Sequence, residues 1–160
     1  MILVTVGTYP LQFDRLLIAV DEAIEAGRIR ESAFAQTGVS LYQPRHMQHA
    51  SMLDKDAFDR YFAEASAIIS HAGMGTITMA LDRGTPILVF PRVKRYKEHV
   101  NDHQVATARE FERLGHVLAA FDKQELVEKS QRLKSFAPKP RQDQAEQVAI
   151  RIASFLNDCV

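Results

Sequence analysis

Five short, largely apolar runs alternate with amphipathic helical patterns along this chain, and this alternation limits the folds open to it. The runs lie at residues 2–6 (ILVTV), 32–38 (SAFAQTG), 67–70 (AIIS), 86–91 (PILVFP) and 116–121 (HVLAAF). Strands that are covered on both faces are apolar almost throughout, as most of these are. The sequence therefore predicts an α/β fold: an open, mostly parallel, Rossmann-like sheet with helices on both faces.

Helical periodicity fills the intervals between these runs. The predicted helices cover residues 14–27, 54–66, 76–84, 98–115 and 122–136, and a last amphipathic helix covers 144–157. Segment 39–53 is hard to assign and holds at most a short strand. In a parallel sheet the strand ends meet at one edge, where ligands bind. Three glycine-bearing turns are expected at that edge: Gly7-Thr8, Gly38 and Gly73 to Thr76.

Length and charge limit the number of domains and the kinds of binding partner. The 160 residues fit one domain, 1–160, with residues 142–158 as a C-terminal helix that either packs on the sheet or docks a partner. Twenty basic and twenty acidic residues leave no net charge to attract nucleic acid, so anions need a local site. One cysteine, Cys159, and the lack of a signal peptide or membrane-span pattern predict a cytoplasmic location.

The stretch SHAGMGTITMAL, residues 70–81, carries the clearest binding signal. Glycines at a helix start let the exposed backbone amides approach a phosphate closely. The Thr76 hydroxyl and the His71 ring would be further donors. The alternative is an ordinary strand-to-helix turn with Thr76 as the N-cap, and the local pattern leaves both interpretations open.

A second polar cluster, KEHVNDHQ, begins the predicted helix 98–115. It holds Glu98, His99, Asn101, Asp102, His103 and Gln104, a dense set of donors and acceptors that suits a polyhydroxylated ligand or, alternatively, a solvated helix start. His99 and His103 would share a helix face, but no third metal ligand is evident, so no metal is expected. Asp54 and Asp56 form a DxD pattern that helix capping explains.

Other nucleotide-binding signatures fit less well. The chain has no GxxxxGK[ST], which excludes a P-loop. GMGTIT lacks the third glycine of a dinucleotide fingerprint and does not follow the first strand. An NADP-dependent enzyme, with Arg92 as a phosphate ligand, remains a weaker alternative.

Three segments in order, VTVGT, ISHAGMGT with ALDRGTPILVFPR, and EHVNDHQ, resemble the C-terminal domain of family 28 glycosyltransferases. The similarity runs from about residue 2 to residue 115 and is greatest to split members, namely PssE-type exopolysaccharide transferase subunits and the small catalytic subunit of the dolichol-pathway N-acetylglucosaminyltransferase. It implies the C-terminal half of a GT-B fold. It also implies a metal-independent, inverting transfer from a UDP-sugar to a lipid-linked acceptor.

The resemblance also implies site residues. His71, Glu98 and His99 are the catalytic candidates, with the general base left open because a partner could supply it. The implied nucleotide-sugar ligands are Gly7, Thr8, Gly38, His71, Gly73, Met74, Gly75, Thr76, Arg92, His99, Asn101, Asp102, His103 and Gln104. Related transferases often have a ribose-binding glutamate where this chain has Met79, which weakens the uridine assignment.

A whole GT-B enzyme needs two such domains. The resemblance therefore implies a membrane-associated acceptor-binding subunit that recruits this chain to the membrane, with homo-oligomers as an option for the isolated protein. A non-catalytic activator or degenerate homologue in the same complex is the alternative function.

Overall fold

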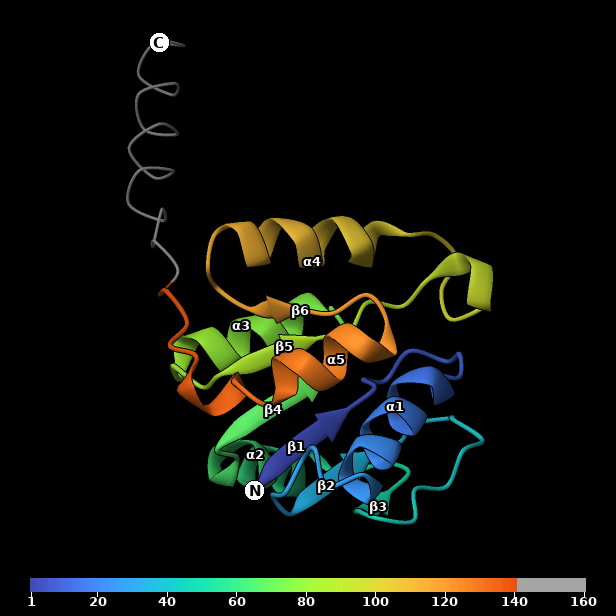
Figure 1. Cartoon of the computed structure of the whole chain (residues 1–160). Coiled ribbons are helices and arrows are strands. Elements are labelled where there is room, and N and C mark those ends of the chain that lie inside the picture. The colour runs from blue at the N-terminus through green and yellow to red at the C-terminus, as the bar shows by residue number, and fades with distance from the viewer. Residues whose placement is uncertain (141–160) are drawn as a thin grey trace, which may run out of the picture.

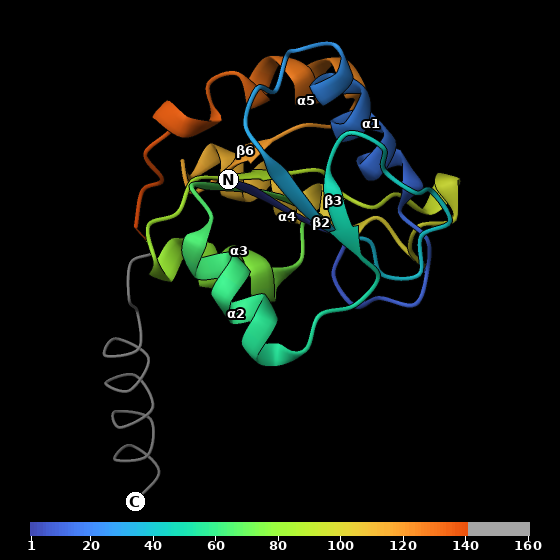
Figure 2. The ribbon, with the colours of Figure 1, turned by 90° about the horizontal axis from the view of Figure 1, so that it is seen from below.

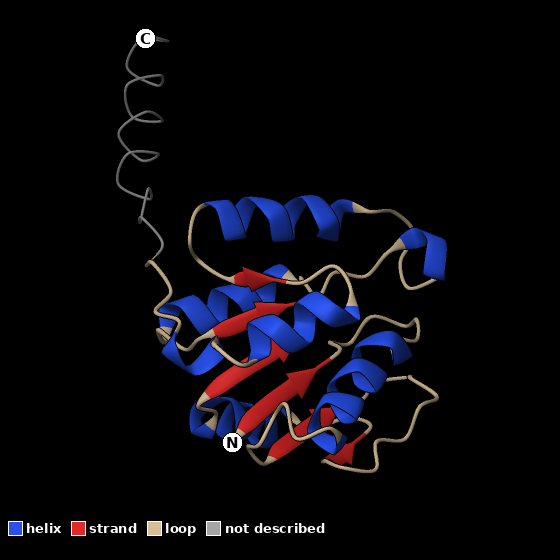
Figure 3. Ribbon diagram, viewed as in Figure 1, coloured by secondary structure: helices blue, strands red, loops and turns tan. Residues whose placement is uncertain are grey.

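The computed structural model describes residues 1–140 and contains one six-stranded, all-parallel sheet (Figures 1 and 3). The strand order is β3-β2-β1-β4-β5-β6. The strands are β1 (Ile2–Thr5), β2 (Ala33–Gln36), β3 (Gln48–Ala50), β4 (Ala67–Ser70), β5 (Ile87–Val89) and β6 (Leu118–Ala119). The predicted α/β sheet is thus confirmed, and the segment that was hard to assign supplies the edge strand β3.

Helices cover both faces of the sheet, as Figures 1 and 2 show. They are α1 (Asp14–Glu25), α2 (Lys55–Glu64), α3 (Met74–Asp82), α4 (His103–Arg113) and α5 (Lys123–Ser130), with 3-10 turns at Lys94–Tyr96 (η1) and Leu133–Ser135 (η2). Alternate strand residues point to opposite faces, so Val4 packs in the core under α1 and α5 while Leu3 packs in the core with α2, α3 and α4.

The direction in which strands are added to the sheet changes at β1. β2 and β3 follow on one side of β1, and β4, β5 and β6 follow on the other. β1 pairs with β2 on one side and with β4 on the other, both parallel. The connections after these strands therefore leave in opposite directions and open a crevice at the carboxyl ends of β1 and β4, where ligands of such sheets bind. This is the edge that the glycine turns were expected to line.

Two predicted helix boundaries are wrong. α3 begins at Met74 with Gly73 as its N-cap, so Thr76 lies inside the first turn and caps nothing. Residues 98–102 form a loop, and α4 begins only at His103. Polar side chains there bond to nearby backbone, as when the Asp102 carboxylate accepts the Lys94 amide at 2.7 Å. Such local bonds compete with helix formation.

The predicted helix 144–157, the docking helix 142–158 and Cys159 lie outside the described residues. Within residues 1–140, none of the helices is long and apolar enough to cross a membrane.

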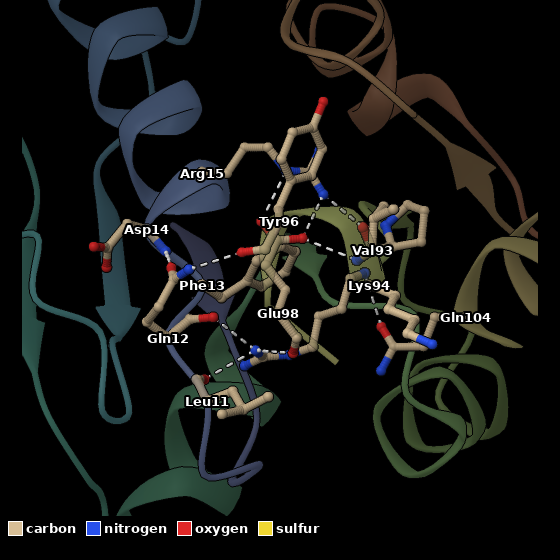
Figure 4. A network of polar contacts seen from close by, with 12 residues as sticks. Leu11, Gln12, Phe13, Asp14, Arg15, Val93, Lys94, Tyr96, Glu98 and Gln104 are labelled. Carbon is tan, nitrogen blue, oxygen red and sulfur yellow. Dashed lines mark hydrogen bonds and ion pairs between the residues drawn. The ribbon is translucent and has the colours of Figure 1, made fainter. Parts of the chain in front are cut away.

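A buried arginine ties the loops at the carboxyl edge together, and Figure 4 labels three of the residues to which it donates, Leu11, Gln12 and Glu98. Arg92 follows β5 and is fully buried. Its guanidinium donates to the carbonyls of Leu11 at 2.9 Å, Gln12 at 3.0 Å, Glu98 at 3.1 Å and Val6 at 2.8 Å. One cation thus fixes the loop after β1 against the loop before α4, as only a planar group with several donors can do.

We expect Arg92→Met to lower the free energy of unfolding by about 3–5 kcal/mol, because four buried carbonyls lose a charged donor. Arg92→Lys should recover only part of the loss, since an ammonium cannot reach all four. Urea unfolding measures both effects. The exposed Arg132→Met is the control and should change stability by less than about 0.5 kcal/mol; an equal loss there would contradict the assigned role.

Candidate active site

A cavity of about 430 Å³ opens at the carboxyl edge of the sheet, between the starts of α2 and α3. It is lined by Thr5, Gly7, Thr8, Gln36, Leu53, Asp54, Lys55, Phe58, His71, Gly75, Thr76 and Met79. Five predicted site residues are among them: Gly7, Thr8, His71, Gly75 and Thr76. The first glycine turn and the second, far apart in sequence, therefore meet at one cavity.

The His71 ring occupies the space that side chains at Gly7 and Gly73 would need. A Cβ atom on Gly7 would lie 2.5 Å from the ring Cε1, and one on Gly73 would lie 2.1 Å from Nε2. Gly7 also has a φ of +74°, which other residues rarely adopt. These two positions are glycine because an imidazole packs between them. Close approach to a phosphate is not needed to explain them.

Gly75 is different, because its backbone faces open space. A Cβ atom built there meets nothing within 4 Å, and the residue lines the cavity. Its conformation is ordinary helix, so packing does not require a glycine. The absent side chain leaves room for a ligand above the first turn of α3.

No side chain caps the N-terminus of α3. By contrast, Asp54 accepts from the Ala57 amide at 2.8 Å at the start of α2, and Asp122 accepts from the Glu125 amide at 2.9 Å at the start of α5. The first amides of a helix carry the positive end of its dipole and attract anions. α3 therefore presents uncapped donors to the cavity, and the capping role expected for Asp54 is confirmed.

The His71 imidazole is neutral at physiological pH. Burial lowers the pKa of His71 to about 4, helped by the nearby positive charge of Arg92 and by His99. The backbone N–H of His71 donates to the Thr5 carbonyl at 3.2 Å, while the buried ring atom Nδ1 has no hydrogen-bond partner among the described residues. A neutral ring offers one donor and one acceptor nitrogen. Buried polar atoms without partners are rare, and each needs an explanation such as a catalytic role or an ordered water.

Three aromatic rings, those of Tyr9, His99 and His103, pack together near His71. Tyr9 stacks on His99 with ring centroids 4.4 Å apart and an interplanar angle of 14°, and His103 meets His99 edge-on at 4.6 Å. Burial lowers the pKa of His99, with further lowering by His103 and Arg92. The Asn101 side-chain oxygen Oδ1 accepts a hydrogen bond from Nδ1 of His103. His99, Asn101 and His103 thus lie together, held by contacts within a loop rather than by a shared helix face.

Glu98 belongs to the scaffold. It is 1% exposed, and its carboxylate pairs with Arg15, with both oxygens 2.9 Å from guanidinium nitrogens. It also accepts the Val93 amide at 2.9 Å. Both carboxylate oxygens are engaged in the interior, so the structure gives Glu98 a scaffold role and no contact that supports the predicted catalytic one.

Arg92 and Gln104 are also part of the scaffold. Arg92 is fully buried, and its Nη1 and Nη2 atoms donate to four protein carbonyls, while the buried Nε has no partner among the described residues. The structure therefore gives no support to Arg92 as the phosphate ligand of the NADP interpretation. The Gln104 side-chain oxygen accepts the Arg92 amide at 3.1 Å. The predictions of Arg92 and Gln104 as ligand residues are therefore corrected: both position the loops around the cavity.

The remaining predicted residues are not part of the cavity lining. The Gly38 amide donates to the Ser51 carbonyl at 2.8 Å, so Gly38 joins the loops after β2 and β3. Asp102 binds the Lys94 amide, and Met74 is half exposed at the start of α3. Among residues 1–140, no group of three or more His, Cys, Asp or Glu side chains is placed to hold a metal ion.

Sequence reasoning missed one wall of the cavity. Leu53 and Phe58 supply apolar surface there beside Met79, the residue that the sequence had marked, and Lys55 is the basic residue of the lining. Phe58 lies in the predicted helix 54–66, and helical periodicity does not show which residue of a helix borders a cavity. Tyr9 was missed too, although it directly follows the predicted Gly7-Thr8 turn.

Comparison with known proteins gives one consistent family. Residues 1–158 match the sequence model of the glycosyltransferase family 28 C-terminal domain. No curated protein matches the chain significantly.

Solved structures share the fold at low sequence identity. The NMR structure of ALG13 has a TM-score of 0.57 and 17% identity, covering 87% of each chain. The glycotransferase of kitacinnamycin has a TM-score of 0.62 and 20% identity, covering 84% of this chain and 34% of that one. MurG from Acinetobacter baumannii has a TM-score of 0.54 and 19% identity, covering 94% and 48%. This chain therefore spans less than half of the kitacinnamycin enzyme and of MurG.

We expect acid to destabilise the protein through His71. In the unfolded chain this histidine gains a proton near pH 6.5, whereas the folded protein resists protonation to about pH 4. The stability that the neutral His71 contributes is therefore fully present above pH 6.5 and is lost as the pH drops toward 4, by about 3 kcal/mol in all. Urea unfolding of wild type and His71→Asn across this range measures it. The variant should lack this part of the slope, and the exposed His49→Asn should keep it.

Proposed function

This chain belongs to the glycosyltransferase family 28 C-terminal domain family, and on that premise we propose that its cavity binds the donor of a sugar transfer. The donor is a UDP-sugar, and the acceptor is a lipid-linked saccharide in polysaccharide or glycan assembly. The chain is then the donor-binding, catalytic part of a hexosyltransferase.

The observation that carries this proposal is the open N-terminus of α3 beside the space at Gly75. The donor diphosphate binds the first amides of α3, including those of Gly75 and Thr76, with the Thr76 hydroxyl as a further donor. A cavity of about 430 Å³ is within the size range of small-molecule sites. The proposal uses Gly75, which packing leaves unexplained, and does not need Gly7 or Gly73 as ligands.

The reaction is an inverting displacement. The acceptor hydroxyl oxygen forms a bond to the anomeric carbon as the bond from that carbon to the diphosphate oxygen breaks, and the electron pair leaves with the diphosphate. Negative charge grows on the leaving group, where preorganised amides and the neutral His71 ring stabilise it. The amides take the place that a metal ion has in other transferases, so the proposed mechanism uses no metal cofactor.

The acceptor proton needs a base. Glu98 is engaged by Arg15, and the one acceptor nitrogen of a neutral His99 ring, Nδ1, accepts the Asn101 amide at 3.3 Å. His99 can serve as the base only by giving up that long contact, and a group of the acceptor-binding part is the other candidate.

We propose that the acceptor-binding part is a separate, membrane-associated subunit. The chain covers 87% of the ALG13 structure but only 48% of MurG, so it corresponds to a structure of similar extent and to part of a larger one. The complex forms in the cytoplasm and at the membrane. Without its partner, the partner-binding face of this subunit is left uncovered, which permits self-association.

Met79 bears on donor recognition. It lines the cavity with Leu53 and Phe58, so the position where related transferases often bind ribose presents a thioether instead of a carboxylate. The nucleoside is then held by apolar contact and shape. If the chain were a non-catalytic member of the complex, the cavity would not bind the nucleotide at all.

We expect the isolated protein to bind UDP saturably, and Gly75→Asp to weaken this binding by at least 10-fold. An aspartate in the first turn favours the helix but places a negative charge where the diphosphate binds. Isothermal titration calorimetry gives the dissociation constants.

Gly75→Asn is the matched control, because it has the same shape without the charge. It should bind UDP more tightly than Gly75→Asp, and both should unfold at or above the wild-type temperature. Wild-type protein that takes up no UDP at millimolar concentration would reject the donor site and favour the non-catalytic alternative. Equal affinities of the two variants would reject the placement of the diphosphate on α3.

We expect His71→Ala to lower turnover in the complete enzyme about 100-fold, because one preorganised donor to the leaving group is lost. Steady-state transfer from the UDP-sugar measures this, with thermal unfolding at pH 7.5 as a check of the fold. Replacing the exposed His49 by alanine should leave turnover unchanged. Full activity in His71→Ala would exclude His71 from the reaction.

A further inference from the structure

The segment that follows Arg92 carries three basic side chains into solvent. Lys94, Arg95 and Lys97 are all exposed, and they lie on η1 and its C-cap. Figure 1 shows η1 protruding from the edge of the molecule, on the loop between β5 and α4. We call residues 94–100 the basic turn.

The three cations of the basic turn take part in none of the ion pairs formed within residues 1–140. Lys55, Lys123, Lys129 and Lys134 each have a carboxylate partner instead. Glu98 is neutralised by Arg15, and Asp102, whose carboxylate accepts the Lys94 amide, offsets one of the three positive charges. A chain with no net charge therefore keeps a local excess of positive charge at this point.

The basic turn is fixed by hydrogen bonds within its own backbone and by contacts with Arg15, and Figure 4 shows Arg15, Tyr96 and Glu98 together. The Tyr96 and Lys97 amides donate to the carbonyls of Val93 at 3.1 Å and Lys94 at 2.9 Å. The Arg15 guanidinium lies 4.9 Å from the centre of the Tyr96 ring while it binds Glu98. The cations therefore project from a fixed base rather than from a loose loop.

Apolar side chains accompany the charges. Tyr96 is 43% exposed and Val100 is 63% exposed, and Arg95 lies 4.6 Å from the Tyr96 ring centre. Lys97 has a φ of +58°, and it is the one residue other than glycine with positive φ in the described part of the chain. A strained backbone of this kind persists where surrounding contacts enforce it, and it is common at functional sites.

We infer that the basic turn docks this protein directly on an anionic lipid bilayer. Lysine and arginine are attracted to the negative surface of such membranes, while tyrosine and an aliphatic side chain enter the interfacial layer. A protruding tip fits a broad, flat surface; a nucleic-acid strand needs a groove that follows its backbone.

This contact goes beyond the proposed function and does not depend on it. It gives the chain its own attachment to the membrane, in addition to any partner. Because the basic turn follows β5, it lies at the same carboxyl edge of the sheet as the cavity. A bilayer bound there faces the edge at which the cavity opens.

The test is flotation of the full chain with vesicles of phosphatidylcholine alone or mixed with phosphatidylglycerol. Wild type should float only with the mixed vesicles and detach at high salt. Each basic residue near an anionic surface contributes about fivefold, so the triple variant Lys94→Gln, Arg95→Gln, Lys97→Gln should partition about 100-fold less. Lys97→Gly removes one charge and relieves the strained φ, so it should fold at least as stably and bind about fivefold less.

The matched control removes three exposed cations, also without an ion pair within residues 1–140, from the opposite edge of the sheet: Arg28→Gln, Arg30→Gln, Arg132→Gln. These residues lie before β2 and between α5 and η2, and the net charge changes equally. The control should float like wild type. An equal loss in the control, or wild type that floats equally with neutral vesicles or with none, would overturn the inference. UDP titration of the triple variant should match wild type, so membrane docking and donor binding succeed or fail separately.

Discussion

One buried guanidinium organises the functional edge of this protein. Arg92 bonds to carbonyls on the loop after β1 and to the loop before α4, two segments that share no secondary structure. That bond set brings Tyr9 against His99, and it places a positive charge near His71 that helps to keep the imidazole neutral. The Arg15–Glu98 pair continues the network outward to the basic turn. The proposed donor site and the proposed membrane contact therefore share one scaffold.

The glycines of the carboxyl edge have two separate physical roles. Gly7 and Gly73 leave space for the His71 ring, so their substitution would break packing inside the protein. Gly75 faces open space on a helix that any residue could continue, and helix propensity alone would favour alanine there. A position that gives up helix stability without a packing reason is a better marker of ligand contact than a glycine pair read as a motif.

Particular residues show how far the sequence leads. The apolar runs predicted five of the six strands and the parallel sheet because burial on both faces leaves a local signature. HAGMGT predicted a functional turn, and the structure places its His71, Gly75 and Thr76 at one cavity with Gly7 and Thr8. The pattern KEHVNDHQ did not separate ligand-binding groups from scaffold groups, because a polar cluster looks the same whether its groups face solvent, a ligand or one another. Glu98 and Gln104 are engaged by partners distant in sequence or on another segment, which no local pattern reveals.

The sequence by itself determined the fold class, the edge of the sheet at which the cavity opens and the turn that lines it, since these follow from periodicity and glycine placement over short spans. Only the tertiary structure decided which polar groups are free to act. Glu98 and Arg92 become scaffold because long-range contacts satisfy them, while the start of α3 stays open because no side chain reaches it. The physical reason is that a buried hydrogen bond depends on what lies opposite in space, and that is fixed by packing of the whole sheet.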